Sequence, residues 1–255
     1  MKKHRVRYYR DEQTDFFPGG EGYTLPEGYR WVRTDSFSRL LSALVYGAAL
    51  LFAAVYCPLV LHIRIRGAGK LREAGKSGFF FYGNHTQPVG DVVTPALACF
   101  PRRIYTVVSP ANYALPGIGK ILPYLGALPI PSSRGVMRDF TEAVACRIAG
   151  GHPVVVYPEA HVWPYYTGIR PFSSTAFKLP VKLQAPVYCF TVTYQKRRWG
   201  KRPAMVVYVD GPIRPAGDSP RAQAQSLRDG VLETMRRRSR ESRCAYVTYM
   251  REENQ

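Results

Sequence analysis

The sequence predicts an α/β domain with a mostly parallel sheet flanked by helices, preceded by an N-terminal hydrophobic segment that associates with a membrane. Three observations support this prediction. Short apolar runs rich in β-branched and aromatic residues alternate with helical stretches after residue 62. An uncharged apolar segment fills residues 40–61. Polar residues follow directly after two of the short runs, at the strand ends where parallel sheets place their functional sites.

The charge balance is strongly basic. The 255-residue chain has 36 Lys and Arg against 18 Asp and Glu, a formal net charge of +18. So large an excess favours a polyanionic partner, either an anionic membrane surface or nucleic acid. The 18 tyrosines are scattered and form no RNA-stacking motif. We therefore expect membrane lipids as partners and no nucleic acid.

The cysteines argue against a disulfide framework and a zinc site. They are odd in number, far apart and mostly set in apolar runs, at positions Cys57, Cys99, Cys146, Cys189 and Cys244. This pattern indicates buried thiols in a reducing compartment. No carboxylate, His or Cys cluster has metal-ligand spacing, so we expect no metal and no cofactor.

We divide the chain into a basic arm without periodicity (residues 1–39), a membrane-associating helical segment (40–62) and the α/β domain (63–255). As a helix, the uncharged run is long enough to cross a hydrocarbon core of about 30 Å. Arginines flank it on both sides, so the positive-inside rule selects no orientation. A segment that dips into one leaflet, bending at Gly47 or Pro58, and a buried core helix remain alternatives.

Within the α/β domain we expect strands at residues 63–65, 79–82, 104–108, 127–130, 154–157, 187–193 and 205–209. The clearest helices cover residues 136–148, 174–183 and 220–240. No internal repeat interrupts this alternation, which is typical of a single α/β unit.

The first polar motif follows the run at 79–82 and reads Gly-Asn-His-Thr-Gln-Pro-Val-Gly-Asp over residues 83–91. A histidine such as His85 can accept a proton near neutral pH, and a carboxylate such as Asp91 can select its tautomer. Taken alone, a histidine in a turn is more often a structural hydrogen-bonding residue, and Asp91 also suits the N-cap of a following helix. Assigning a catalytic role to this motif therefore requires a second motif.

The second motif lies at residues 151–159, where a β-branched run ends in Tyr157-Pro158-Glu159. Pro158 cannot continue an internal ladder, so Glu159 should lie in a loop near His85 if the two strands are neighbours. The two strand-end motifs together are far more specific than either alone.

In these motifs the chain resembles the PlsC-like glycerolipid acyltransferases, the lysophosphatidate acyltransferase family. Their first motif is Asn-His, four residues and Asp, and their third reads Phe-Pro-Glu-Gly-Thr. Residues 125–134, 168–179 and 185–190 are similar to further parts of the family pattern. The resemblance extends from about residue 63 to about residue 238.

The resemblance implies an acyltransferase with His85 as general base and Asp91 as its orienting partner. An acyl group would pass from acyl-CoA or acyl-carrier protein to the hydroxyl of 1-acylglycerol-3-phosphate, in phospholipid synthesis at the cytoplasmic face of the cell membrane. Arg134 and Glu159 would serve the acceptor phosphate, with Asn84 and His161 as further substrate-binding residues. Because a carboxylate repels phosphate, we expect Glu159 to organise Arg134 or nearby backbone donors.

The chain also departs from the family pattern. Five residues separate His85 from Asp91, because Gly90 stands where the family aspartate is expected. Ala160-His161 replaces the Gly-Thr of the third motif. These changes encourage an alternative acceptor, either another lysophospholipid or a glycolipid. A membrane lipid-binding relative without catalysis is the alternative outside the enzymes.

Overall fold

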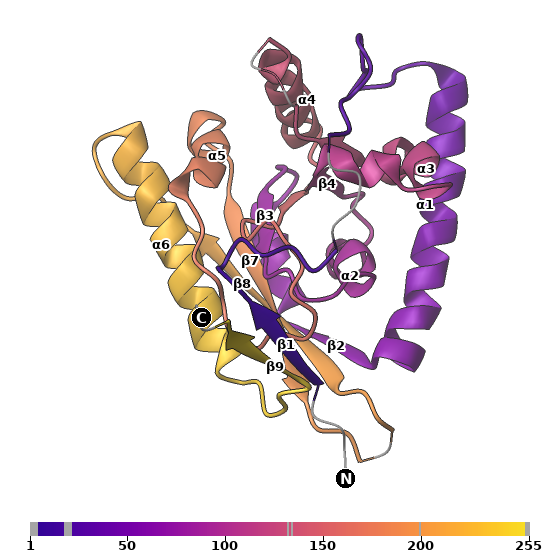
Figure 1. Ribbon diagram of the computed structural model, residues 1–255. Coiled ribbons are helices and arrows are strands. Elements are labelled where there is room, and N and C mark those ends of the chain that lie inside the picture. The colour runs from indigo at the N-terminus through magenta and orange to yellow at the C-terminus, as the bar shows by residue number, and fades with distance from the viewer. Residues whose placement is uncertain (1–4, 18–21, 132, 134, 199, 253–255) are drawn as a thin grey trace.

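The computed structural model describes residues 5–17, 22–131, 133, 135–198 and 200–252. A seven-stranded sheet forms the centre, and a two-stranded sheet joins the terminal segments (Figure 1). In chain order the elements are β1 (Arg5–Tyr9), α1 (Ser36–Tyr56), η1 (Cys57–Leu61), β2 (Ile63–Arg66), η2 (Ala68–Ala74), β3 (Phe80–Gly83), α2 (Gly90–Cys99), β4 (Tyr105–Val108), η3 (Pro110–Ala114), α3 (Ile118–Leu125), β5 (Ala127–Pro129), α4 (Met137–Ala149), β6 (Val154–Val156), η4 (Ser174–Phe177), α5 (Lys178–Lys182), β7 (Val187–Gln195), β8 (Ala204–Ile213), α6 (Pro220–Ser239) and β9 (Val247–Arg251).

The large sheet has the strand order β2-β8-β7-β3-β6-β4-β5. Only β7 and β8 pair antiparallel, and the other neighbours are parallel. All seven runs expected as strands belong to this sheet, so the prediction of a mostly parallel sheet flanked by helices is confirmed.

The core continues on both faces of the sheet because side chains around β3 alternate between them. Phe79 and Phe81 belong to a cluster with residues of α1, η1 and α2. Phe80 and Tyr82 belong to a second cluster with residues of α4, η4 and α6. All four side chains are buried. A strand buried on both faces is expected in the middle of a parallel sheet.

The hydrophobic segment forms α1 and continues into η1. Asp35 caps α1 by accepting a hydrogen bond from the Ser38 amide at 2.8 Å, so the helix begins before the uncharged run does. The combined segment Ser36–Leu61 has a mean hydropathy of 2.2 and is only 17% buried over its most apolar window. By length and composition it could cross a membrane.

The sequence pattern did not predict β1, which pairs in parallel with β9 from the opposite end of the chain. A two-stranded pairing between such distant segments has little local signature. The helix α3 was also missed, and α2 was considered only as a segment that Asp91 could cap. Each contains a proline, at Pro95 and Pro123, which argues against a helix when the sequence is considered alone.

A buried carboxylate on β8 links both faces of the sheet. Asp210 accepts hydrogen bonds from Lys70 of η2 at 2.7 Å and from two nitrogens of Arg238 on α6 at 2.7 and 2.8 Å. Burial alone would raise the pKa of Asp210, but the two cations outweigh it and hold the pKa at about 2.

Candidate active site

The loop after β3 is attached to the neighbouring strand β7. Gly83 ends β3 against Phe190, and a Cβ added at Gly83 would lie 2.1 Å from the Cζ atom of that ring. The next residue, Asn84, donates from Nδ2 to the Val192 carbonyl at 3.1 Å and accepts from the Val192 amide at 2.8 Å. Asn84 is only 1% exposed, so its side chain holds the loop against β7.

His85 and Asp91 are in direct contact. His85 Nδ1 lies 2.8 Å from Asp91 Oδ2, and the same oxygen accepts the amides of Thr86 and Gln87 at 2.8 Å each. The side chains are 20% and 1% exposed, respectively. Asp91 lies in the first turn of α2, whose N-cap is Val89, so the carboxylate binds the preceding loop instead of capping the helix.

The extra residue between His85 and Asp91 is accommodated by a tight turn. Val92 donates to the Val89 carbonyl at 3.2 Å, and Asp91 donates to the Gln87 carbonyl at 3.0 Å. Gly90 begins α2, where a Cβ would lie 2.9 Å from the Gln87 Cβ. The turn therefore brings the Asp91 carboxylate back to the imidazole despite the longer spacing.

Tyr157 supports the His85 ring, and sequence reasoning did not identify it as a functional residue. The two rings stack with centroids 4.3 Å apart and an interplanar angle of 18°. The Tyr157 hydroxyl donates a hydrogen bond to the Asp91 backbone carbonyl. Tyr157 follows β6, which pairs in parallel with β3, so both motifs emerge at the same edge of the sheet. Its place beside Pro158 was the signal that could have identified it.

Glu159 contacts the guanidinium of Arg170 and two backbone amides. Its Oε2 lies 3.3 Å from Arg170 Nη2 and accepts the His85 amide at 3.4 Å, while Oε1 accepts the Arg170 amide at 3.3 Å. Arg170 also donates to the carbonyls of Glu12 and His161. Arg170 was not among the expected site residues, and the expected arginine, Arg134, lies outside the described residues.

Burial controls the electrostatics of the site. It raises the pKa of the Glu159 carboxyl, which the Arg170 charge opposes, and it lowers the pKa of the Arg170 guanidinium. Burial also raises the pKa of Asp91, and the hydrogen bond from His85 opposes that change. Each charged form therefore depends on its partner, because an unpaired charge at these positions would be poorly solvated.

The N-terminal arm covers the loop after β6. His161 Nδ1 lies 3.1 Å from Asp15 Oδ2, and the Trp163 indole donates to the Thr14 carbonyl at 2.9 Å. Trp163 is 1% exposed and stacks on Tyr249 of β9 with ring centroids 4.9 Å apart. The side chain of His161 is thus bound to the arm. Within the described part of the chain, no group of three or more His, Cys, Asp or Glu residues is placed to hold a metal ion.

The chain matches no protein-family model and no curated protein sequence. Among solved structures it is similar to the 1-acyl-sn-glycerophosphate acyltransferase PlsC from Thermotoga maritima, with a TM-score of 0.58. The match covers 83% of this chain and 85% of that protein at 15% sequence identity. At this low identity the similarity shows a shared architecture and does not show a shared substrate. The chain has the fold of the PlsC acyltransferase.

Proposed function

We propose that this protein is a membrane-associated acyltransferase. It moves a fatty acyl group from acyl-CoA or acyl-carrier protein to the hydroxyl of 1-acylglycerol-3-phosphate. The observation that carries the proposal is the His85–Asp91 contact of 2.8 Å at the carboxyl end of β3. The PlsC fold adds support, since a solved protein with this architecture is a 1-acyl-sn-glycerophosphate acyltransferase.

His85 acts as the general base. Because Nδ1 contacts the Asp91 carboxylate, we assign the imidazole proton to Nδ1 and the free lone pair to Nε2. Nε2 takes the proton of the acceptor hydroxyl as the oxygen attacks the thioester carbonyl. The new C–O bond forms, the C–S bond then breaks, and the leaving thiolate receives the proton from His85. The imidazolium formed between these steps is stabilised by Asp91.

The surrounding residues act by positioning. Asp91 is fixed by three hydrogen-bond donors, and the Tyr157 ring restricts the plane of His85. Glu159 accepts the His85 amide and links it to Arg170, so it supports the loop instead of touching phosphate. Asn84 holds the same loop to β7.

Two substrate contacts remain part of the proposal. Arg134 is assigned to the acceptor phosphate, because a guanidinium binds phosphate oxygens through paired hydrogen bonds. His161 is assigned to the acceptor side of the site, which it reaches by releasing Asp15. The exposed apolar side chains of α1 and the net charge of +18 support the proposal that the protein binds an anionic membrane surface, and we propose the cytoplasmic face.

Acyl transfer in detergent is the direct test. Labelled acyl-CoA and acyl-carrier protein are offered with lysophosphatidate, other lysophospholipids and a glycolipid acceptor. We expect product with lysophosphatidate, and a loss of about 10²–10⁴ in kcat for His85→Ala. Asp91→Asn should also lower kcat, whereas Asp218→Asn, an exposed control with the same charge change, should not.

The outcomes separate the alternatives. Product with only another lysophospholipid or a glycolipid keeps the mechanism and changes the acceptor. Full turnover by a folded His85→Ala variant contradicts the assignment of the base. No transfer from either donor, by protein with an intact unfolding transition, favours a lipid-binding relative without catalysis.

A further inference from the structure

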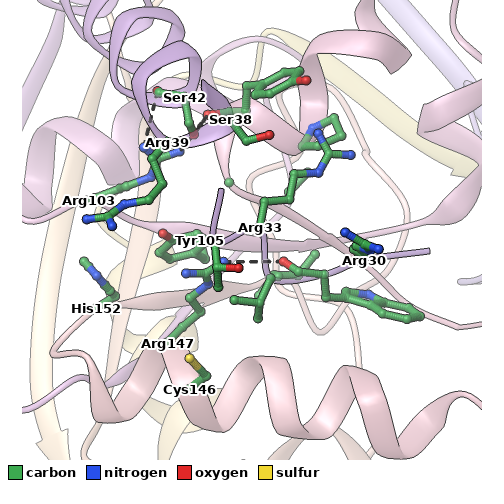
Figure 2. A pocket seen from close by; sticks show the side chains of 18 of the residues that line it. Arg30, Arg33, Ser38, Arg39, Ser42, Arg103, Tyr105, Cys146, Arg147 and His152 are labelled. Atoms are coloured by element: carbon green, nitrogen blue, oxygen red, sulfur yellow. Dashed lines mark hydrogen bonds between the residues drawn. The ribbon is translucent and has the colours of Figure 1, made fainter. Parts of the chain in front are cut away.

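A cavity of about 450 Å³ lies between the N-terminal arm, the start of α1, α4 and the segment that enters β4 (Figure 2). Its most unusual feature is its lining. Figure 2 shows basic side chains from five separate segments around this one cavity, namely Arg30, Arg33, Arg39, Arg103, Arg147 and His152. Aromatic residues and residues of β4 and β5 also line it.

The cavity is at the opposite edge of the sheet from His85. Tyr105 and Ala127, the first residues of β4 and β5, line it, and His152 precedes β6. These strands run parallel to β3, and His85 follows the carboxyl end of β3. A strand of four residues separates the two edges by roughly 13 Å. The cavity is therefore a different place from the candidate active site.

Among the described residues, no carboxylate lines the cavity, and the nearby Asp35 interacts with Arg33 only through longer-range attraction. No described carboxylate forms an ion pair with any of the five arginines. Within the described residues, the buried Nε atoms of Arg103 and Arg147 also lack a hydrogen-bond acceptor. Burial lowers the pKa of His152, and the neighbouring charges of Arg147 and Arg103 lower it further. Such a concentration of like charge is costly unless an anion joins it.

Three of the arginines are held in place before any ligand arrives. Arg103 donates to the Ser42 hydroxyl and to the Tyr124 carbonyl at 2.6 Å each. The guanidinium of Arg147 stands over the Tyr105 ring at 4.3 Å, and that of Arg33 over Tyr124 at 5.0 Å. Guanidinium groups fixed in this way lose little conformational entropy when they bind an anion.

The start of α1 connects the cavity to the apolar surface of that helix. Ser38, Arg39 and Ser42 line the cavity. Phe37 and Leu40 lie in the same turns and are 73% and 62% exposed. An anion at the polar end of an apolar helix would lie at the height of lipid headgroups if α1 enters a membrane.

We propose that this cavity is a binding site for a phosphate-bearing anion. Arginine suits this chemistry because its planar fork pairs with phosphate oxygens. The phosphate can come from the headgroup of an anionic phospholipid or from a soluble phosphate compound. The proposal concerns binding alone and stands whether or not the protein transfers acyl groups.

Cys146 provides a natural reporter, since it lines the cavity and is an exposed free cysteine. Cys57, Cys99 and Cys189 are buried, and the half-buried Cys244 can be replaced by Ser. The alkylation rate of Cys146 is measured on the detergent-purified full chain. It is compared without addition, with pyrophosphate, and with vesicles of phosphatidylcholine alone or mixed with phosphatidic acid. We expect at least one phosphate source to slow alkylation about tenfold at saturation, because the bound anion shields the thiol.

Variants test whether the arginines are responsible for the protection of Cys146 from alkylation. Arg33→Gln/Arg147→Gln should raise the concentration for half-protection by about 100-fold, because two charge-assisted hydrogen-bonding groups are lost. Arg30→Gln/Arg39→Gln is the second pair, chosen because both side chains are exposed and folding does not depend on them. Arg236→Gln/Arg237→Gln, on the exposed face of α6, is the control with an equal charge change and should retain protection.

The vesicle and pyrophosphate arms separate the sources. Protection by pyrophosphate that both cavity variants weaken supports a soluble phosphate ligand. Protection by phosphatidic acid vesicles, absent with phosphatidylcholine alone and weakened in both variants, supports a lipid headgroup. The proposal is overturned by equal protection from both vesicle types without protection by pyrophosphate, by unchanged protection in folded cavity variants, or by no protection from any phosphate source.

Discussion

Replacing Glu159 by Gln tests whether the buried ion pair stabilises the fold of the site. The Arg170 and Glu159 side chains are 2% and 0% exposed, with 3.3 Å between Nη2 and Oε2. Removing the negative charge leaves the Arg170 guanidinium buried without a counter-ion. Breaking a buried pair from one side costs about 3–5 kcal/mol. We expect about 3 kcal/mol, the lower end of that range, because Arg170 keeps the carbonyl oxygens of Glu12 and His161 as acceptors.

The chain supplies a matched control in the exposed pair Arg138–Glu142. These side chains are 85% and 61% exposed, yet their contact is shorter, at 2.7 Å. Water solvates both charges, so Glu142→Gln should change the free energy of unfolding far less than Glu159→Gln. If the length of the contact decided the effect, Glu142→Gln would destabilise the protein more than Glu159→Gln.

Urea unfolding in detergent, followed by tryptophan fluorescence, measures both variants. The double variant Glu159→Gln/Arg170→Met should lose less free energy of unfolding than the sum of the two single variants, because it also removes the guanidinium charge that Glu159→Gln leaves unpaired. Equal unfolding midpoints for Glu159→Gln and Glu142→Gln would refute the reasoning. So would full additivity of the two changes at the buried pair.

Three further predictions concern other parts of the molecule. Asp210→Asn should lower the free energy of unfolding at pH 7 by about 1–2 kcal/mol. The folded-state pKa of Asp210 is depressed from 3.8 to about 2, so the deficit should vanish as the pH falls from about 4 to 2 in urea titrations. Gly83→Ala should destabilise the protein by about 1–3 kcal/mol through contact with the Phe190 ring, and Phe190→Leu should make the combined loss less than additive in the same assay. Leu44→Ser/Leu51→Ser on the exposed face of α1 should reduce vesicle co-sedimentation at least about tenfold, and unchanged partitioning would show that this face does not enter lipid.

The sequence alone determined the strands of the large sheet and the sheet edge on which the candidate site lies. A buried parallel strand is a local run of apolar residues, so its position can be predicted without knowledge of its neighbours. The same holds for the apolar segment that became α1 and for the strand-end positions of His85 and Glu159. The spacing of His85 and Asp91 could not show whether the two would meet, because that depends on the turn at Gly90.

Tertiary structure decided which side chains act together. Arg170 became the partner of Glu159, and Tyr157 stacked on His85, through loop packing that has no sequence period. The pairing of β1 with β9 joins opposite ends of the chain, and the cavity proposed to bind phosphate is lined by residues between 29 and 152. Local sequence patterns indicate whether a residue is buried. Contacts between residues far apart in the sequence form only when the whole chain packs. For that reason the fold class could be predicted from the sequence, and the cavity lined by arginines could not.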